Sequence, residues 1–224
     1  MAVEAGAEAI VTAHHADDQA ETLLMRACRG AGMATLAGIA RVRSDRVVRP
    51  LLGVDRAALV AAARLLGVTW WEDPSNQSPV YQRNRFRHEV LPVLGCVAPQ
   101  AARGLARTAD NIAGHAGALH HWVAAAVTPH AERSAGQLAL PRALVPNETA
   151  LLAPLLAWIC GELQVEPPSQ GGVRQLVQLL RSTQGSAVNG APRGAGPATC
   201  RLHGLEVALE RDLARFTVAP AQPI

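Results

Sequence analysis

The stretch HHADDQAET carries a dense group of ionisable side chains: His14, His15, Asp17, Asp18 and Glu21. Asp18 and Glu21 are three positions apart, a spacing that places two side chains on one face of a helix. Carboxylates grouped in this way can hold Mg²⁺ or the ammonium group of an amine substrate. The alternative is that Asp17 caps a helix and the histidines are ordinary loop residues. One helix start needs a single capping residue, so we interpret this stretch as functional.

A second polar group lies in the segments EDPSN (72–76) and RNRFRH (83–88). The first of these segments has the composition of a turn. In the second, Arg83 and Arg87 are four positions apart and share one face of a helix, whereas Arg85 points elsewhere. Such an arginine group either clamps a phosphate or nucleic-acid backbone or forms a solvated helix face. The residues by themselves leave that choice open.

An alternation of helices and strands is expected to position these groups. The expected elements are the end of a helix at 2–8, a strand at 9–13, a helix at 17–29, a strand-like segment at 47–52, a helix at 56–66 with Asp55 as its N-cap, and a strand at 68–72. This alternation is typical of a parallel α/β sheet, in which ligands bind at the carboxyl ends of the strands. His14 and His15 follow such a strand end directly.

The rest of the chain is expected to be mostly helical. Helices are predicted within 84–128 and at 149–163 and 170–182, then a Gly/Pro-rich loop at 185–200 and a strand or hairpin at 201–209. The sequence therefore predicts an α/β fold: a partial, N-terminally truncated Rossmann-like parallel sheet followed by a mostly α-helical domain. The predicted parts are residues 1–90, 91–184 and 185–224.

Composition excludes several classes of protein. With 49% hydrophobic and 17% charged residues, the chain can form a core and is not disordered as a whole. It has no apolar run of about 18 residues and no signal-peptide pattern, so we expect a cytoplasmic protein with no membrane partner. Its 4 cysteines form no Cys-x-x-Cys pair, which argues against a zinc knuckle or an iron–sulfur site.

Four segments taken together resemble the tRNA(Ile)-lysidine synthetases of the PP-loop ATP pyrophosphatase superfamily. They are AHHADDQAETLLMR (13–26), RGAGMATLAGI (29–39), RPLLGV (49–54) and WEDPSNQSPVYQRNRFRHEVLPVL (71–94). The histidine–carboxylate motif is shared with related superfamily enzymes, whereas EDPSN followed by RNRxRHxxLP is specific to the lysidine synthetases. The resemblance covers residues 5–95, and residues 96–224 resemble the helical substrate-binding region of the family more loosely.

The resemblance implies a two-step, ATP- and Mg²⁺-dependent reaction. The wobble cytidine of a tRNA(Ile) with a CAU anticodon is adenylated at C2, and free L-lysine then displaces AMP to give lysidine. By the same resemblance Asp18, Glu21 and Arg85 are expected to be catalytic, with the carboxylates holding the lysine or orienting the reacting groups. The expected substrate- and tRNA-binding residues are His14, His15, Asp17, Arg49, Asp73, Asn76, Arg83, Asn84, Arg87 and His88. Metal ligands are not assigned, and the family suggests a homodimer.

One family motif has no counterpart in this sequence. The family binds ATP with an S-G-G-x-D-S loop, and neither GAGMA (30–34) nor GGV (171–173) has that pattern. A misplaced start is the explanation we favour, ahead of an inactive remnant or a second polypeptide that supplies the missing half. We expect no ATP–pyrophosphate exchange by this chain alone, and robust exchange would contradict that expectation.

Two other functions compete with lysidine formation. A PP-loop tRNA thiolation enzyme uses similar His and Asp residues, but cluster-bearing forms need a Cys-x-x-Cys pair that this sequence lacks. A non-catalytic tRNA-binding remnant would bind tRNA in a salt-dependent way without a lysine-dependent reaction.

Overall fold

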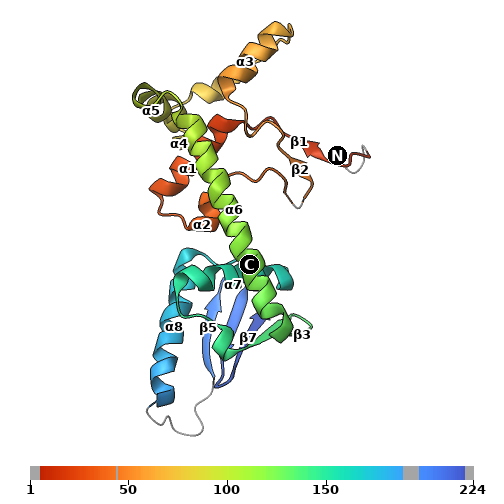
Figure 1. The fold of residues 1–224 in the computed structure, drawn as a ribbon, viewed down its shortest axis with the longest axis vertical. Coiled ribbons are helices and arrows are strands. Elements are labelled where there is room, and N and C mark those ends of the chain that lie inside the picture. Colours follow the sequence, from red (N-terminus) through yellow and green to blue (C-terminus); the bar gives the residue numbers. More distant parts are fainter. Residues whose placement is uncertain (1–5, 44, 189–196, 220–224) are drawn as a thin grey trace. The chain divides into compact units, whose positions relative to one another are not determined.

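A computed structural model describes residues 6–43, 45–188 and 197–219. The chain forms two compact units, Met1–Ala116 and Gly117–Ile224, and helix α6 (Ala101–Val127) runs across their division (Figure 1). The sequence predicts a boundary near residue 90, where the composition becomes Ala-rich. The first turns of α6 belong to the N-terminal unit because ion pairs tie them to it. Arg103 pairs with Asp55, and Asp110 pairs with Arg41 at 2.7 Å.

The N-terminal unit contains the first of the expected parallel strand pairs. Its elements are β1 (Ile10–Val11), α1 (Ala16–Cys28), α2 (Met33–Leu36), β2 (Val47–Val48), α3 (Arg56–Leu65), η1 (Pro74–Gln77), α4 (Gln82–Arg85), η2 (Phe86–Val90) and α5 (Leu91–Val97). Strands β1 and β2 run parallel with Ile10 opposite Val47 and Val11 opposite Val48. The predicted mixture of helices with a small parallel sheet is therefore confirmed, with strands shorter than predicted.

The strand predicted at residues 68–72 is wrong. The backbone N–H of Val68 bonds to the carbonyl of Ala63 at 2.9 Å, and that of Gly67 bonds to Arg64 at 3.2 Å. Gly67 has φ of +66°, so the chain closes α3 with a left-handed C-terminal turn instead of continuing to a neighbouring strand. Residues 6–8 are not helical either, and residues 2–5 of that predicted helix lie outside the described residues.

The starts of α1 and α3 are coupled through acidic side chains. His15 is the N-cap residue of α1, and its backbone N–H donates to Oδ2 of Asp18 at 2.9 Å. Asp17 therefore does not cap α1; its Oδ2 instead accepts from the backbone N–H of Arg56 at 2.9 Å, the first residue of α3. Asp55 occupies the predicted N-cap position of α3, but its side chain pairs with Arg103.

A buried glutamine anchors α1 to the segment that follows α2. Gln19 is 1% exposed; its side-chain oxygen accepts from the N–H of Ile39 at 2.6 Å, and its amide donates to the carbonyl of Ile39 at 3.2 Å. This approach is possible because residue 38 is glycine. Its φ is +75°, and a Cβ built on it would lie 2.4 Å from Oε1 of Gln19.

We expect Gly38→Ala to destabilise the protein by about 2 kcal/mol, because it combines left-handed backbone strain with displacement of Gln19. Gly30 is a matched control, since its φ is +67° but a Cβ there meets nothing within 4 Å. Gly30→Ala should cost about 1 kcal/mol, the backbone strain alone. Urea unfolding followed by circular dichroism measures both, and equal costs would show that the contact with Gln19 contributes nothing.

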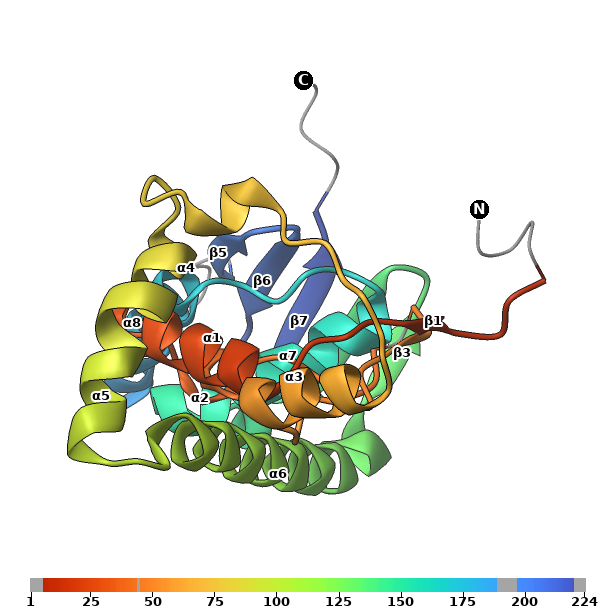
Figure 2. The ribbon, with the colours of Figure 1, turned by 90° about the horizontal axis from the view of Figure 1, so that it is seen from above.

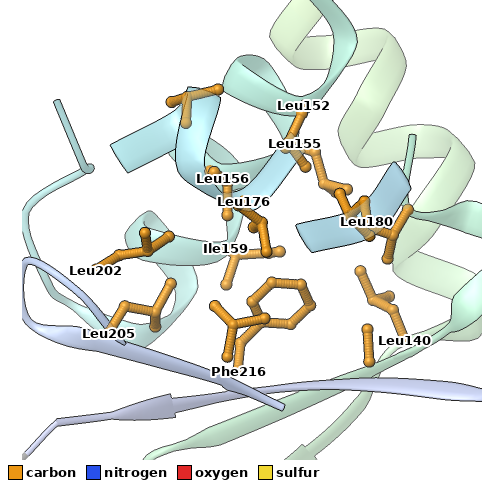
Figure 3. Close-up of a cluster of buried hydrophobic side chains, with 14 of the residues drawn as sticks. Leu140, Leu152, Leu155, Leu156, Ile159, Leu176, Leu180, Leu202, Leu205 and Phe216 are labelled. Atoms are coloured by element: carbon orange, nitrogen blue, oxygen red, sulfur yellow. The ribbon is translucent and has the colours of Figure 1, made fainter. Parts of the chain in front are cut away.

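The C-terminal unit is an antiparallel sheet with helices on one face. Its elements after α6 are η3 (Thr128–His130), β3 (Glu132–Ser134), β4 (Gln137–Pro141), η4 (Arg142–Leu144), α7 (Thr149–Leu163), α8 (Gln170–Val188), β5 (Ala198–Leu202), β6 (Leu205–Leu209) and β7 (Leu213–Val218). The strand order is β3-β4-β7-β6-β5, and Figure 2 shows the last three strands side by side. Figure 3 shows Phe216 and Leu205 of the sheet beneath Ile159 of α7 and Leu176 of α8, all fully buried.

The predictions for the C-terminal half are partly confirmed and partly wrong. The predicted helices at 149–163 and 170–182 are confirmed, and the second continues to Val188. The part predicted to be helical, residues 91–184, also contains strands β3 and β4. The strand or hairpin predicted at 201–209 belongs to a five-stranded sheet. β4 pairs with β7, which follows it by two helices and a hairpin, and local patterning does not reveal a pairing that distant. Part of the predicted Gly/Pro-rich loop, residues 189–196, lies outside the described residues.

In the described parts of the chain, no helix has both the length and the apolar character needed to cross a bilayer.

Candidate active site

Two buried carboxylates of α1 and two partly exposed arginines of α4 and η2 form an ion-pair network. Glu21 is 0% exposed and Asp18 is 7% exposed. Glu21 accepts from Nε of Arg83 and from Nε of Arg87, each at 2.7 Å. Oδ1 of Asp18 accepts from Nη2 of Arg83 at 2.6 Å and from Nη2 of Arg87 at 3.0 Å. We call these four residues the carboxylate–arginine network.

Helical spacing assembles this network from both sides. Asp18 and Glu21 are one turn apart on α1, and Arg83 and Arg87 are one turn apart on the helical stretch formed by α4 and η2. The predicted common face of the two arginines is therefore confirmed. Arg85, which the family resemblance predicts to be catalytic, points away from the network, as its helical spacing predicts, and pairs with Glu89 at 3.1 Å on the exposed side. The guanidinium groups of Arg83 and Arg87 are held by buried carboxylates, and both side chains stay partly exposed.

Burial and ion pairing set the charge of the network and of the neighbouring histidine. Burial acts to lower the pKa of Arg87, but its pairing with Glu21 and Asp18 outweighs burial and raises that pKa. Burial lowers the pKa of His14 from its ordinary value of 6.5, and Arg49 and Arg83 act in the same direction against Asp18. His14 is therefore neutral at pH 7. Its Nδ1 lies 2.9 Å from Oγ1 of Thr12, which leaves Nε2 for another partner.

One cleft of about 320 Å³ joins the network to the carboxyl end of β1. It is lined by Thr12, Ala13, His14, Asp18, Asn76, Arg83, Asn84 and Arg87. Most of these were predicted as site residues from the sequence. Thr12 and Ala13 were not, although their place at the end of a predicted strand is a signal that could have identified them.

The remaining predicted residues of the second group hold a loop in place. Asp73 begins η1 and accepts from the N–H of Ser75 at 2.9 Å, which lowers the pKa of its carboxyl. The amide of Asn84, which is buried, donates to the carbonyls of Ser75 at 2.8 Å and Ser78 at 2.9 Å. Nε2 of His88 lies 3.1 Å from the carbonyl oxygen of Asn76. These contacts fix the position of Asn76 at the edge of the cleft.

Two other predicted residues have structural partners near α1. Arg49 is 8% exposed, and its Nη1 donates to the carbonyl of Ala40 at 2.7 Å. His15 lies beside the first turn of α1, with Nδ1 3.6 Å from Asp17 and Nε2 3.4 Å from Asp18. The approach of His15 and the N–H of Arg56 lower the pKa of Asp17, against the opposing effect of burial.

This arrangement does not fit a divalent cation at the two carboxylates. The described residues contain no group of three or more His, Cys, Asp or Glu side chains placed to hold a metal ion. The oxygens of Asp18 and Glu21 also already accept hydrogen bonds from Arg83 and Arg87, which leaves too few free lone pairs for the several oxygen ligands of a divalent cation. The N-terminus of α1 does not fit a phosphate either, because Asp17 and Asp18 occupy its first turn.

The lowered pKa of Asp17 gives a pH-dependent term in stability. A carboxyl whose pKa is lower in the folded state stabilises that state above its ordinary value, here 3.8, and this contribution disappears as the pH falls through the lowered pKa. We expect the stability of Asp17→Asn to fall less steeply than that of the parent chain between about pH 5 and pH 3. Urea midpoints across this range measure the difference. His15→Gln should flatten the curve in the same way, and parallel curves for all three proteins would contradict the assignment.

Comparison with known proteins shows what the sequence of this chain is similar to. Residues 1–94 match the ATP_bind_3 model of the PP-loop domain. The tRNA(Ile)-lysidine synthase of Thermobifida fusca is 44% identical over 144 residues, which are 62% of this chain and 44% of that protein. That of Pseudomonas aeruginosa is 48% identical over 108 residues, covering 47% and 24% of the two proteins. That of Xanthomonas campestris is 40% identical over 188 residues, covering 80% and 42%. The chain thus spans less than half the length of these relatives.

Proposed function

We propose that this chain takes part in forming lysidine on tRNA. Its residues 1–94 match the PP-loop domain model, and its sequence is similar to those of tRNA(Ile)-lysidine synthases. The proposed substrates are ATP, free L-lysine and the wobble cytidine of a tRNA(Ile) with a CAU anticodon. ATP supplies the AMP group that activates C2 of the cytidine, and the amine of lysine then attacks C2 as AMP leaves. The observation that carries the proposal is the carboxylate–arginine network at the edge of the cleft.

The arginines are suited to a reaction in which a phosphate departs. The side chain of Arg83 is 39% exposed and that of Arg87 is 24% exposed, and the two carboxylates hold both guanidinium groups in place. Fixed guanidinium groups that already face the place where negative charge develops need no reorganisation during the reaction. We therefore assign charge stabilisation to Arg83 and Arg87 and not to Arg85, whose pairing with Glu89 keeps it outside the cleft.

The carboxylate of Asp18, beside the arginines, is suited to the amine. Asp18 lines the cleft and presents negative charge to an incoming ammonium group. Glu21 does not line the cleft, and it pairs with both arginines. The attacking amine must lose a proton, and Nε2 of the neutral His14 can accept it. Asp73, Asn84 and His88 act as positioning residues because they hold the loop that carries Asn76.

Lysine incorporation tests this function directly. The native protein, captured from its source cells with an antibody to residues 117–224, is incubated with ATP, radiolabelled lysine and a tRNA(Ile) transcript with a CAU anticodon. We expect label in the RNA only when ATP is present, and none in a transcript whose wobble cytidine is replaced by uridine. RNA binding that weakens with salt, without any lysine incorporation, would instead identify a non-catalytic tRNA-binding protein.

A further inference from the structure

A larger cavity lies on the other side of Arg87 from the cleft. Its volume is about 660 Å³, within the roughly 300–1,000 Å³ range typical of small-molecule sites. Glu21 and Arg87 of the carboxylate–arginine network line this cavity. Leu91 and Pro92 of α5 contribute apolar side chains to its lining. The cavity belongs entirely to the N-terminal unit. Nothing in the proposed reaction steps uses it.

Two adjacent tryptophans form the open wall of this cavity. Trp70 is 47% exposed and Trp71 is 78% exposed, although both belong to an apolar segment that follows α3. Large aromatic side chains left in water at the mouth of a pocket are typical of binding surfaces. Their flat faces stack on nucleobases, and this is the main way in which proteins hold the splayed bases of single-stranded RNA loops.

The polar groups of the cavity match the edge of a base that carries an amino group. The carboxylates of Asp17 and Glu72 and the side-chain amide of Gln77 all line it. Carboxylate oxygens accept hydrogen bonds from the exocyclic amino groups of cytosine, adenine and guanine, and uracil has no such group. The guanidinium of Arg56 is about half exposed and lies 3.8 Å from Glu72, a distance that leaves it available to a phosphate.

We propose that this cavity binds one unstacked, amino-bearing nucleobase of an RNA loop, with Trp71 as the stacking surface. The inference deepens the proposed function, on which it rests: the base would be one of the tRNA substrate beside the cytidine in the cleft. Asp17 and Glu72 select for the amino group, and Arg56 contacts the adjoining phosphate. A free nucleotide offers the same chemistry, so the test separates the two sources.

Fluorescence anisotropy of a labelled hairpin RNA with a CAU loop measures the affinity of the full chain. We expect Trp71→Leu to raise Kd about tenfold, because stacking is lost. Trp122 of α6 is the matched control: it is 77% exposed and does not line the cavity, so Trp122→Leu should change Kd by less than about twofold. A hairpin with an all-uridine loop should bind the parent chain more weakly, and Glu72→Gln should reduce that difference.

Three outcomes would overturn the inference. One is a Kd for the CAU hairpin that is equal in Trp71→Leu and the parent chain, or too weak to measure in both. Another is an equal effect of Trp71→Leu on a fully paired RNA duplex, which has no splayed base to stack. The third is a Trp71-dependent affinity for AMP combined with a Trp71-independent affinity for the hairpin. Lysine incorporation is a separate measurement, so its absence beside Trp71-dependent hairpin binding would reject the proposed reaction and leave this inference standing.

Discussion

Glu21→Gln is expected to destabilise the N-terminal unit by about 2–3 kcal/mol, because it leaves two arginines with a single buried carboxylate, Asp18, as their counter-charge. Glu21 is fully buried and accepts hydrogen bonds from both Arg83 and Arg87. Breaking a buried ion pair from one side costs more than removing it as a whole. The partial exposure of both arginines allows water to solvate them and keeps the cost at the lower end of the usual range.

Hydrogen exchange shows where the loss of stability falls. Glu21→Gln should increase exchange in α1 and in the stretch from α4 to α5, and leave α7 unchanged, because the network lies within the N-terminal unit alone. Glu89→Gln is the matched control: it removes a half-exposed carboxylate that pairs with Arg85 one helical turn away, and its expected cost is below about 0.5 kcal/mol. Equal costs for the two substitutions would mean that the network contributes no more than a surface pair.

Introduced into the native protein and captured from its source cells as above, Asp18→Asn is expected to lower lysine incorporation by about 100-fold or more. The amide cannot supply the negative charge that Asp18 presents to the cleft, and its NH₂ group would face either Nη2 of the two arginines or the backbone N–H of His15 in place of an acceptor. An enzyme should lose turnover, whereas binding of tRNA should stay the same or become slightly tighter because a negative charge near RNA has been removed. The measurement is the initial rate of lysine incorporation beside the Kd for the tRNA transcript.

A control separates lost chemistry from lost folding. Asp110→Asn also replaces a paired aspartate, but Asp110 is 40% exposed and pairs with Arg41 away from the cleft, so its rate should stay within about twofold. The thermal midpoint of each variant shows how much of it is folded during the assay. A rate of lysine incorporation for Asp18→Asn that matches that of the parent protein would remove Asp18 from the proposed mechanism. A rate and a tRNA affinity that fall together would indicate a structural role.

Local spacing alone was sufficient for the parts of the site that lie within one helix. The three-residue step from Asp18 to Glu21 and the four-residue step from Arg83 to Arg87 each predict a shared face, since helical periodicity depends only on sequence separation. The helix at 149–163 was predicted for the same reason, because its apolar run and its boundaries are local features. The motifs in these segments also carried the family resemblance.

The tertiary structure alone decided what these faces meet. Arg83 and Asp18 are 65 positions apart, so no local pattern reveals that one neutralises the other. Sequence separation also hides that Asp17 caps α3 and not α1. Its carboxylate accepts a hydrogen bond from the backbone N–H of Arg56, which lies in a different element. The pairing of β4 with β7 likewise depends on packing against α7 and α8. Long-range partners are selected by burial and by the charge left unpaired at each face, and these quantities exist only once the chain has folded.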